Sequence, residues 1–311
     1  MSTPPPKNPR RRPAQLLIEA CKADDLSIFL EALPLAPSKQ DFISSTVTKS
    51  IRKNATKILS YALDHGGEVP TNGYFPTEAD VAPSTEILEI LLSHGWDINA
   101  RTIGDTPFLW YAVYFSHELV AWCLDHGATA TPKDLHLETR EDRMKDEFGC
   151  PSILEKAAAN ATVKTFELLR SKGAKVGRRT LHFAAAATYK SRVSDEYSQN
   201  TTEEKFSQRL AMVKHLIETI GIDPNALDQP AGYSLGNHWG TPLCYVAKRL
   251  ASPKWDTEDV VSYLLSKGAD PEMTMDPFGF SARSFATDAN NQQMLKLFDD
   301  WKASRTGDGG V

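Results

Sequence analysis

Apolar residues recur at three- and four-residue steps in short segments along most of the chain, and glycines close many of these segments. The clearest stretch is 86–127. One amphipathic segment there ends at His94-Gly95, Thr106-Pro107 opens a second, and a third ends at His126-Gly127. This periodicity predicts short helices that each bury one face. A glycine just beyond a helix ends it easily, because glycine adopts a positive φ at little cost.

The spacing of six closing glycines indicates repeated helix pairs with insertions. They are Gly66, Gly95, Gly127, Gly173, Gly221 and Gly268. The steps between them are 29 and 32 residues, then 46, 48 and 47. Polar and charged stretches place the added residues near 129–148, 189–206 and 228–239. Repeat proteins usually carry insertions in loops, often on the binding face.

The pattern predicts one repeat domain over 14–302, of about seven units, between the tails 1–13 and 303–311. The first tail holds five prolines and a basic cluster from Lys7 to Arg12. Segments of this composition bury too little apolar surface to become ordered, so we expect both tails to be disordered. The basic cluster is either a nuclear import signal or an ordinary Pro/Arg-rich tail.

The motifs inside these units resemble the ankyrin repeat. Residues 106–127 follow the pattern TPLHLAAxxGHxxVVxxLLxxG with the same interval from proline to glycine, and residues 95–100, GWDINA, resemble GADVNA. Further fragments are TLHFAA at 180–185, GIDPNALD at 221–228 and GTPL at 240–243. Threonine before proline suits an N-cap followed by the first helical residue.

The resemblance, which is to degenerate, insertion-rich ankyrin proteins of fungal type, implies an all-α solenoid of helix-turn-helix units with hairpin-like fingers. It also implies that His182 hydrogen-bonds the finger backbone of a neighbouring unit. In this family the fingers and inner helices bind the partner. The corresponding positions here are Ile103, Asp105, Val113, Tyr114, Trp239, Lys248, Arg249 and Phe280. Aromatic residues and arginine are favoured at interface hot spots, and the alternative for each position is an ordinary solvated surface.

Composition narrows the possible partners and compartments. The net charge is −5, which does not indicate the positive surface that binds phosphates and so argues against nucleic acid as the main partner. The N-terminus lacks an apolar signal region, and no stretch approaches the roughly 20 apolar residues of a membrane helix. We therefore expect a cytoplasmic or nuclear monomer that binds protein, with no nucleic-acid or membrane partner. The four cysteines are widely separated and are expected to be reduced.

Motifs for catalysis, cofactors and metals are missing from the sequence. It contains no GxxxxGK[ST], GxGxxG, GxSxG, HExxH or CxxC. His65, His94 and His126 recur, but each directly precedes a closing glycine, where a cation complements the helix carbonyls. We therefore expect no catalytic, cofactor or metal site.

Three functional hypotheses remain open. The first is a non-enzymatic scaffold or adaptor that binds a protein client through the fingers and concave face. The second is an accessory protein, or an unusual enzyme, of a metabolic pathway in which the inserted loops form a small-molecule pocket. The third is a regulator of transcription or ubiquitin transfer, which rests on the basic tail and on the breadth of the family.

Overall fold

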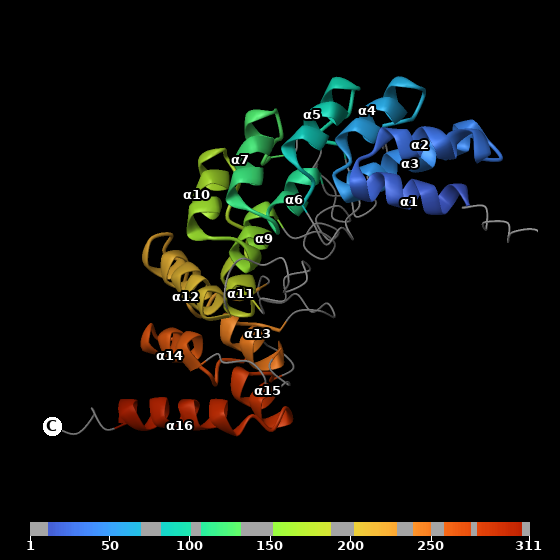
Figure 1. Cartoon of the computed structure of the whole chain (residues 1–311). Coiled ribbons are helices and arrows are strands. Elements are labelled where there is room, and N and C mark those ends of the chain that lie inside the picture. The colour runs from blue at the N-terminus through green and yellow to red at the C-terminus, as the bar shows by residue number, and fades with distance from the viewer. Residues whose placement is uncertain are drawn as a thin grey trace, which may run out of the picture. The chain divides into compact units, whose positions relative to one another are not determined.

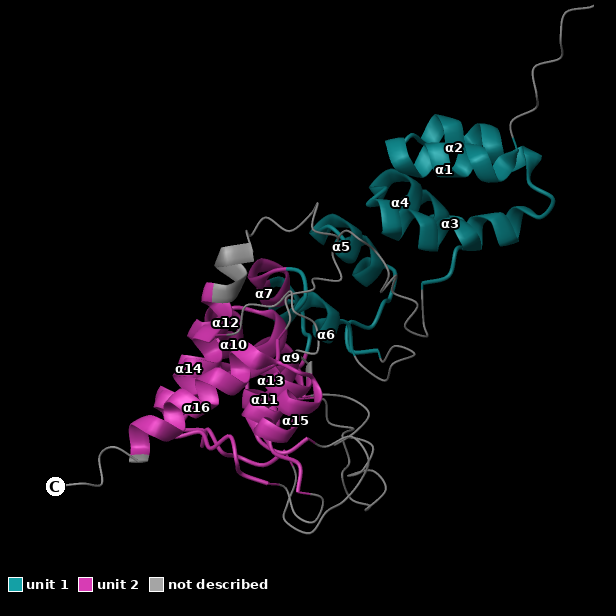
Figure 2. Ribbon diagram, turned by 90° about the horizontal axis from the view of Figure 1, so that it is seen from below, with its two compact units in different colours: residues 1–115, 122–128, 192–197 teal, residues 116–121, 129–191, 198–311 magenta. Residues whose placement is uncertain are grey.

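The computed structural model describes residues 12–69, 82–100, 107–131, 152–187, 202–228, 239–249, 258–274 and 279–306, without the side chains of 202–206, 249 and 306. Within these ranges every regular element is a helix and there is no β-strand (Figure 1), which confirms the all-α prediction. The chain divides into two compact units (Figure 2). The division passes through one helix, α7 (His117–Asp125).

The first unit is built from short antiparallel helix pairs. α1 packs on α2 and α3 on α4, and the pairs join through contacts of α1 with α3 and of α2 with α4. Leu17, Phe29 and Ile58 form part of the core between them, each at most 1 % exposed. The helices are α1 (Pro13–Ala23), α2 (Leu26–Ala32), the 3₁₀ turn η1 (Leu33–Leu35), α3 (Lys39–Lys53), α4 (Thr56–Asp64), α5 (Thr85–Ser93) and α6 (Phe108–Ala112).

The second unit has two parallel rows of helices. α9, α11, α13 and α15 pack successively in one row, and α10, α12, α14 and α16 do so in the other (Figure 1). Each helix of the first row also packs on its successor in the chain, so the unit repeats a helix pair. The bounds are α9 (Ile153–Asn160), α10 (Val163–Ser171), α11 (Thr180–Ala185), α12 (Thr202–Glu218), α13 (Pro242–Arg249), α14 (Glu258–Ser266), α15 (Ala282–Asp288) and α16 (Gln292–Thr306).

All six predicted closing glycines end a helix with φ between +82° and +93°. After five of them the backbone bonds are those of a Schellman motif. For example, the amide of Trp96 donates to the carbonyl of Leu91 at 2.9 Å, and that of Ala128 donates to Cys123 at 2.9 Å. After Gly221, in contrast, the amide of Ile222 donates to Leu216, one residue further back, at 3.0 Å. The glycine spacing therefore located the ends of α4, α5, α7, α10, α12 and α14 correctly.

The GADVNA-like segments form turns that tie one helix pair to the next. In the second unit the carboxylate of Asp223 accepts from the amide of Asn225 at 2.8 Å, which closes an Asx turn. The side chain of Asn225 then donates to the carbonyl of Gly268 and accepts from the amide of Asp270, both at 2.8 Å. In the first unit Asn99 donates similarly to Gly127 at 2.9 Å.

Several boundaries differ from the sequence prediction. α12 begins at Thr202, inside the predicted insertion 189–206, and α16 extends to Thr306, beyond the predicted domain end at 302. Pro107 is the N-cap of α6 rather than its first helical residue. The expected arrangement occurs instead at Thr241, whose hydroxyl oxygen accepts from the amide of Cys244 at 3.4 Å ahead of α13.

Parts of the prediction lie outside the described residues. These are residues 1–11 and 307–311 of the two tails, Thr106, and residues 132–148, 189–201 and 229–238 of the three insertions. Separately, no helix among the described residues is long and apolar enough to cross a membrane.

Candidate functional site

Three of the predicted partner-binding residues lie in one cluster of the second unit. The ammonium of Lys248 lies 5.6 Å from the ring centroid of Trp239 and 4.9 Å from that of Phe285. The ring of Phe285 in turn stacks on Phe280, with centroids 5.5 Å apart and planes within 9°. Trp239, Lys248 and Phe280 are 41 residues apart at most in the chain, and the neighbouring helices α13 and α15 bring them together.

This cluster continues onto α11 as an alternation of rings and cations. The ring of Trp239 lies 4.8 Å from that of Tyr245, and Tyr245 contacts Phe183 edge-on at 6.4 Å. The guanidinium of Arg179 lies 5.3 Å from the ring of Phe183. We call the whole set the cation–aromatic row. It consists of Arg179, Phe183, Tyr245, Trp239, Lys248, Phe285 and Phe280.

The row combines buried anchors with accessible groups. Tyr245 and Phe285 are 5 % and 8 % exposed, whereas Phe280 is 44 % exposed. Trp239 is half-buried and Lys248 is exposed. Among the described residues, no carboxylate lies within ion-pair distance of Lys248. Aromatic groups with a buried edge and an open face are well suited to contact a second molecule.

A buried carboxylate fixes the position of Trp239. One oxygen of Asp228 accepts hydrogen bonds from the amide of Trp239 and from the hydroxyl of Tyr245, both at 2.8 Å. The amide of Asp228 donates to the carbonyl of Gly240 at 3.1 Å. Residues 228 and 239 are the two ends of the third predicted insertion, so these bonds close it at its base. Burial, followed by the charge of Asp228, raises the pKa of Tyr245, which keeps its hydroxyl protonated as a donor.

His182 contacts the same insertion from α11. Its Nε2 lies 2.9 Å from the carbonyl oxygen of Gly240, and its ring meets Tyr245 edge-on at 4.9 Å. This contact with the segment ahead of α13 is the one that we predicted for His182. The side chain is fully buried, and this burial lowers the pKa of His182 to about 4, so the imidazole is neutral.

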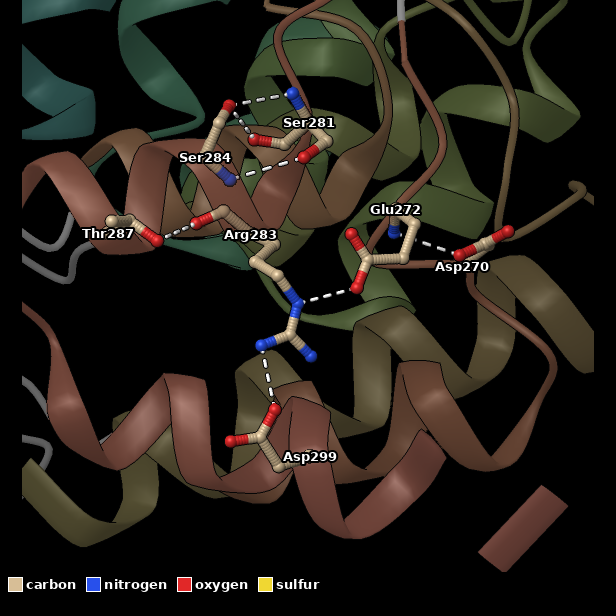
Figure 3. Close-up of polar contacts among 7 residues, drawn as sticks. All are labelled: Asp270, Glu272, Ser281, Arg283, Ser284, Thr287 and Asp299. Atoms are coloured by element: carbon tan, nitrogen blue, oxygen red, sulfur yellow. Dashed lines mark hydrogen bonds and ion pairs between the residues drawn. The ribbon is translucent and has the colours of Figure 1, made fainter. Parts of the chain in front are cut away.

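The start of α15 is fixed on the other side of the row. Ser281 and Ser284 form a capping box, with bonds of 3.2 and 2.8 Å between each amide and the other hydroxyl (Figure 3). Arg283 of α15 binds Glu272, which follows α14, at 2.5 Å (Figure 3). It also binds Asp299 at 2.8 Å and so joins α15 to α16 (Figure 3). Phe280 directly precedes this cap, so its place beside Phe285 is set by the helix start.

Of the other predicted residues, Val113 and Tyr114 belong to the first unit, and the side chains of the remaining three are not described. Val113 is 3 % exposed, so its side chain belongs to the core and is not available to a partner. Tyr114 is half-buried and belongs to the first unit. Ile103 and Asp105 lie outside the described residues, and the side chain of Arg249 is not described.

The sequence analysis did not identify four members of the cation–aromatic row, nor Asp228, which positions Trp239. The four members are Arg179, Phe183, Tyr245 and Phe285. Asp228 could have been noticed, since it occupies the final position of the GADVNAxD-like segment. Phe285 has the low exposure of an ordinary core residue, although its ring also contacts Lys248 and Phe280. Nothing in the local pattern singles out Tyr245, Phe183 or Arg179.

The recurring histidines have structural partners. The Nδ1 of His65, His94 and His126 lies 2.7–2.8 Å from the carbonyl oxygen four residues earlier in each helix. Among the described residues, no group of three or more His, Cys, Asp or Glu side chains is placed to hold a metal ion. Cys21, Cys123 and Cys244 are free and buried, and burial raises the pKa of Cys123 to about 12.

Comparisons with known proteins do not assign the chain to a family. No protein-family model matches the chain, and no curated protein is significantly similar to it. The structure defines an all-α protein of repeated helix pairs, in which the cation–aromatic row is the candidate site.

Proposed function

We propose that this chain is an ankyrin-repeat protein that acts as a non-enzymatic scaffold and binds a protein client in the cytoplasm or nucleus. Support for the repeat type comes from the two-row packing of the second unit and from the six positive-φ glycines. Asn225, which joins successive units, and His182, which binds the next segment, occupy the positions expected from the ankyrin signature.

The observation that carries the binding role is the cation–aromatic row. Three residues chosen from their positions in the sequence lie together, and buried groups hold them in place. A rigid aromatic residue loses little conformational freedom when a partner covers it, so such residues contribute strongly to affinity. The row also follows α11, α13 and α15, which are the inner helices of an ankyrin array under this proposal.

The alternative hypotheses have no comparable support. A small-molecule pocket would be formed by the inserted loops, most of which lie outside the described residues. A role in transcription or ubiquitin transfer rests on the basic tail, which also lies outside them. The titratable groups around the row are engaged in positioning one another, as in Asp228 with Tyr245 and Glu155 with Arg179.

Affinity capture of the full chain from its native extract tests the proposal. The test variant is Trp239→Ala/Lys248→Glu/Arg249→Glu. The matched control is Lys172→Glu/Lys175→Glu/Val176→Ala, which makes the same charge change and removes one exposed apolar side chain after α10. We expect a stoichiometric client to be retained by the wild type and the control and lost by the test variant. A client retained equally by all three would show that the row is not the binding surface.

A further inference from the structure

The charges around the row favour one class of partner. The carboxylates that its members contact are already engaged, Asp228 with Trp239 and Tyr245, and Glu155 with Arg179. Among the described residues, no carboxylate lies within ion-pair distance of Lys248. An exposed cation in this position attracts an acidic group of a ligand.

The two cations of the row differ in what holds them. Arg179 is already paired with Glu155, at 3.9 Å, and its side chain is 13 % exposed. Lys248 is exposed, and its described contacts are the rings of Trp239 and Phe285. Contacts with rings leave part of the ammonium hydration shell open, so Lys248 can still bind an oxygen ligand. Lys248 is thus the cation that remains available for a charge on the partner.

An apolar contact lies next to this charge. Phe280 is 44 % exposed and stacks on Phe285, whose ring is also the nearer contact of Lys248. A ligand that covers Phe280 with an apolar side chain would therefore place its neighbouring residues close to the ammonium of Lys248. A ligand that contacts both Phe280 and Lys248 would have to be a short stretch of polypeptide, because a single ion could pair only with Lys248.

We infer that the row binds an acidic peptide segment of the client, in which a carboxylate pairs with Lys248 and an adjacent apolar side chain covers Phe280. This inference rests on the proposed function, because it names the chemistry of the client at the same surface. Single-stranded nucleic acid also binds surfaces of cations and aromatic rings. The overall negative charge of the chain disfavours it, since phosphate binding depends on an extended positive surface.

Selection of peptides from a random displayed library against the full chain tests the inference. Selected peptides are synthesised in pairs that differ by one Glu→Gln change and are titrated against wild type, Lys248→Met, Lys248→Glu and Trp239→Ala. We expect selection of peptides with Glu or Asp beside an apolar residue. For the wild type, Glu→Gln should weaken binding about threefold to tenfold at low salt, and Lys248→Met should remove this difference while retaining some binding.

The outcomes separate the two proposals. Peptides that require Trp239 but bind equally well with Glu or Gln would overturn the acidic inference and leave the scaffold function standing. If every selected peptide binds Trp239→Ala as tightly as the wild type, the cation–aromatic row is not the binding surface. Both the proposed function at this surface and the acidic-peptide inference would then be wrong. A fluorescent 12-nucleotide oligothymidine is titrated in parallel, and tighter binding of this probe than of any peptide would overturn the inference in favour of nucleic acid.

Discussion

The amide of Trp239 donates a 2.8 Å hydrogen bond to the carboxylate of Asp228, eleven residues earlier in the chain. The same oxygen accepts from Tyr245, and Asp228 is only 3 % exposed. One buried carboxylate therefore holds the two ends of an insertion together and fixes the backbone of Trp239, whose indole lies beside Lys248.

Asp228→Ala should destabilise the protein by about 2–4 kcal/mol, because the half-buried amide of Trp239 and the buried hydroxyl of Tyr245 lose their shared acceptor. Tyr245→Phe removes one of the two bonds and should cost about 1–2 kcal/mol. Urea denaturation of the full chain measures both. Equal, small effects of the two substitutions would show that Asp228 does not anchor the segment.

Asn225→Ala should destabilise the second unit by roughly 1–3 kcal/mol, because Asn225 joins two helix pairs through bonds to Gly268 and Asp270. The matched control is Asn160→Ala, whose side chain donates locally to the carbonyl of Lys156 in α9. Thermal unfolding followed by circular dichroism compares the two variants. A larger loss in the control would contradict the role assigned to Asn225.

His182 should make stability depend on pH in a defined window. Its pKa is about 4 in the folded chain against 6.5 for an ordinary histidine, so the unfolded chain binds the proton more readily between these values. The stability is therefore fully present above pH 6.5 and is lost as the pH falls toward 4.

Relative to His182→Gln, the wild type should lose about 2 kcal/mol of its free energy of unfolding between pH 7 and pH 5. Other titrating groups, including His94, are common to both proteins and cancel in the difference. Urea titrations at several pH values provide the measurement. A difference that stays constant with pH would indicate that His182 is not buried as a neutral imidazole.

Gly95→Ala should destabilise the protein by about 1–2 kcal/mol, because φ at Gly95 is +87°, where an alanine backbone is strained. A steric clash does not contribute, since an added Cβ would meet no atom within 4 Å. Gly95→Asn should cost less, because asparagine tolerates the left-handed region better. Thermal melts of the two variants check the order. If alanine were tolerated as well as asparagine, the glycine would not be needed for its conformation.

The elements predicted correctly are those specified by local chemistry. The six glycines, the helices around them and the contact of His182 depend on short motifs, so the sequence could place them. The first turn of α12 was missed because residues 202–205 contain no apolar side chain, so the helical spacing of apolar residues is not visible there. The glutamates at 203 and 204, which favour the start of a helix, were the available signal.

The candidate site could be predicted only in part. Trp239, Lys248 and Phe280 were chosen by their positions in the repeat, each independently of the others. Their convergence depends on the packing of α13 on α15 and on the bond from Asp228 across the insertion, and neither is visible in local periodicity. Val113 was misplaced for a related reason, because a residue at a helix end can face the core or the solvent, and packing alone decides which.

Hydrogen exchange of the full chain, alone and with the captured client or a selected peptide, locates the binding surface. Binding at the cation–aromatic row predicts slower exchange concentrated in residues 239–249 and 279–288, with α1 to α4 unchanged. The Trp239→Ala/Lys248→Glu/Arg249→Glu variant should show no such protection. Protection confined to the first unit, or persisting in that variant, would contradict the assignment of this surface as the binding site.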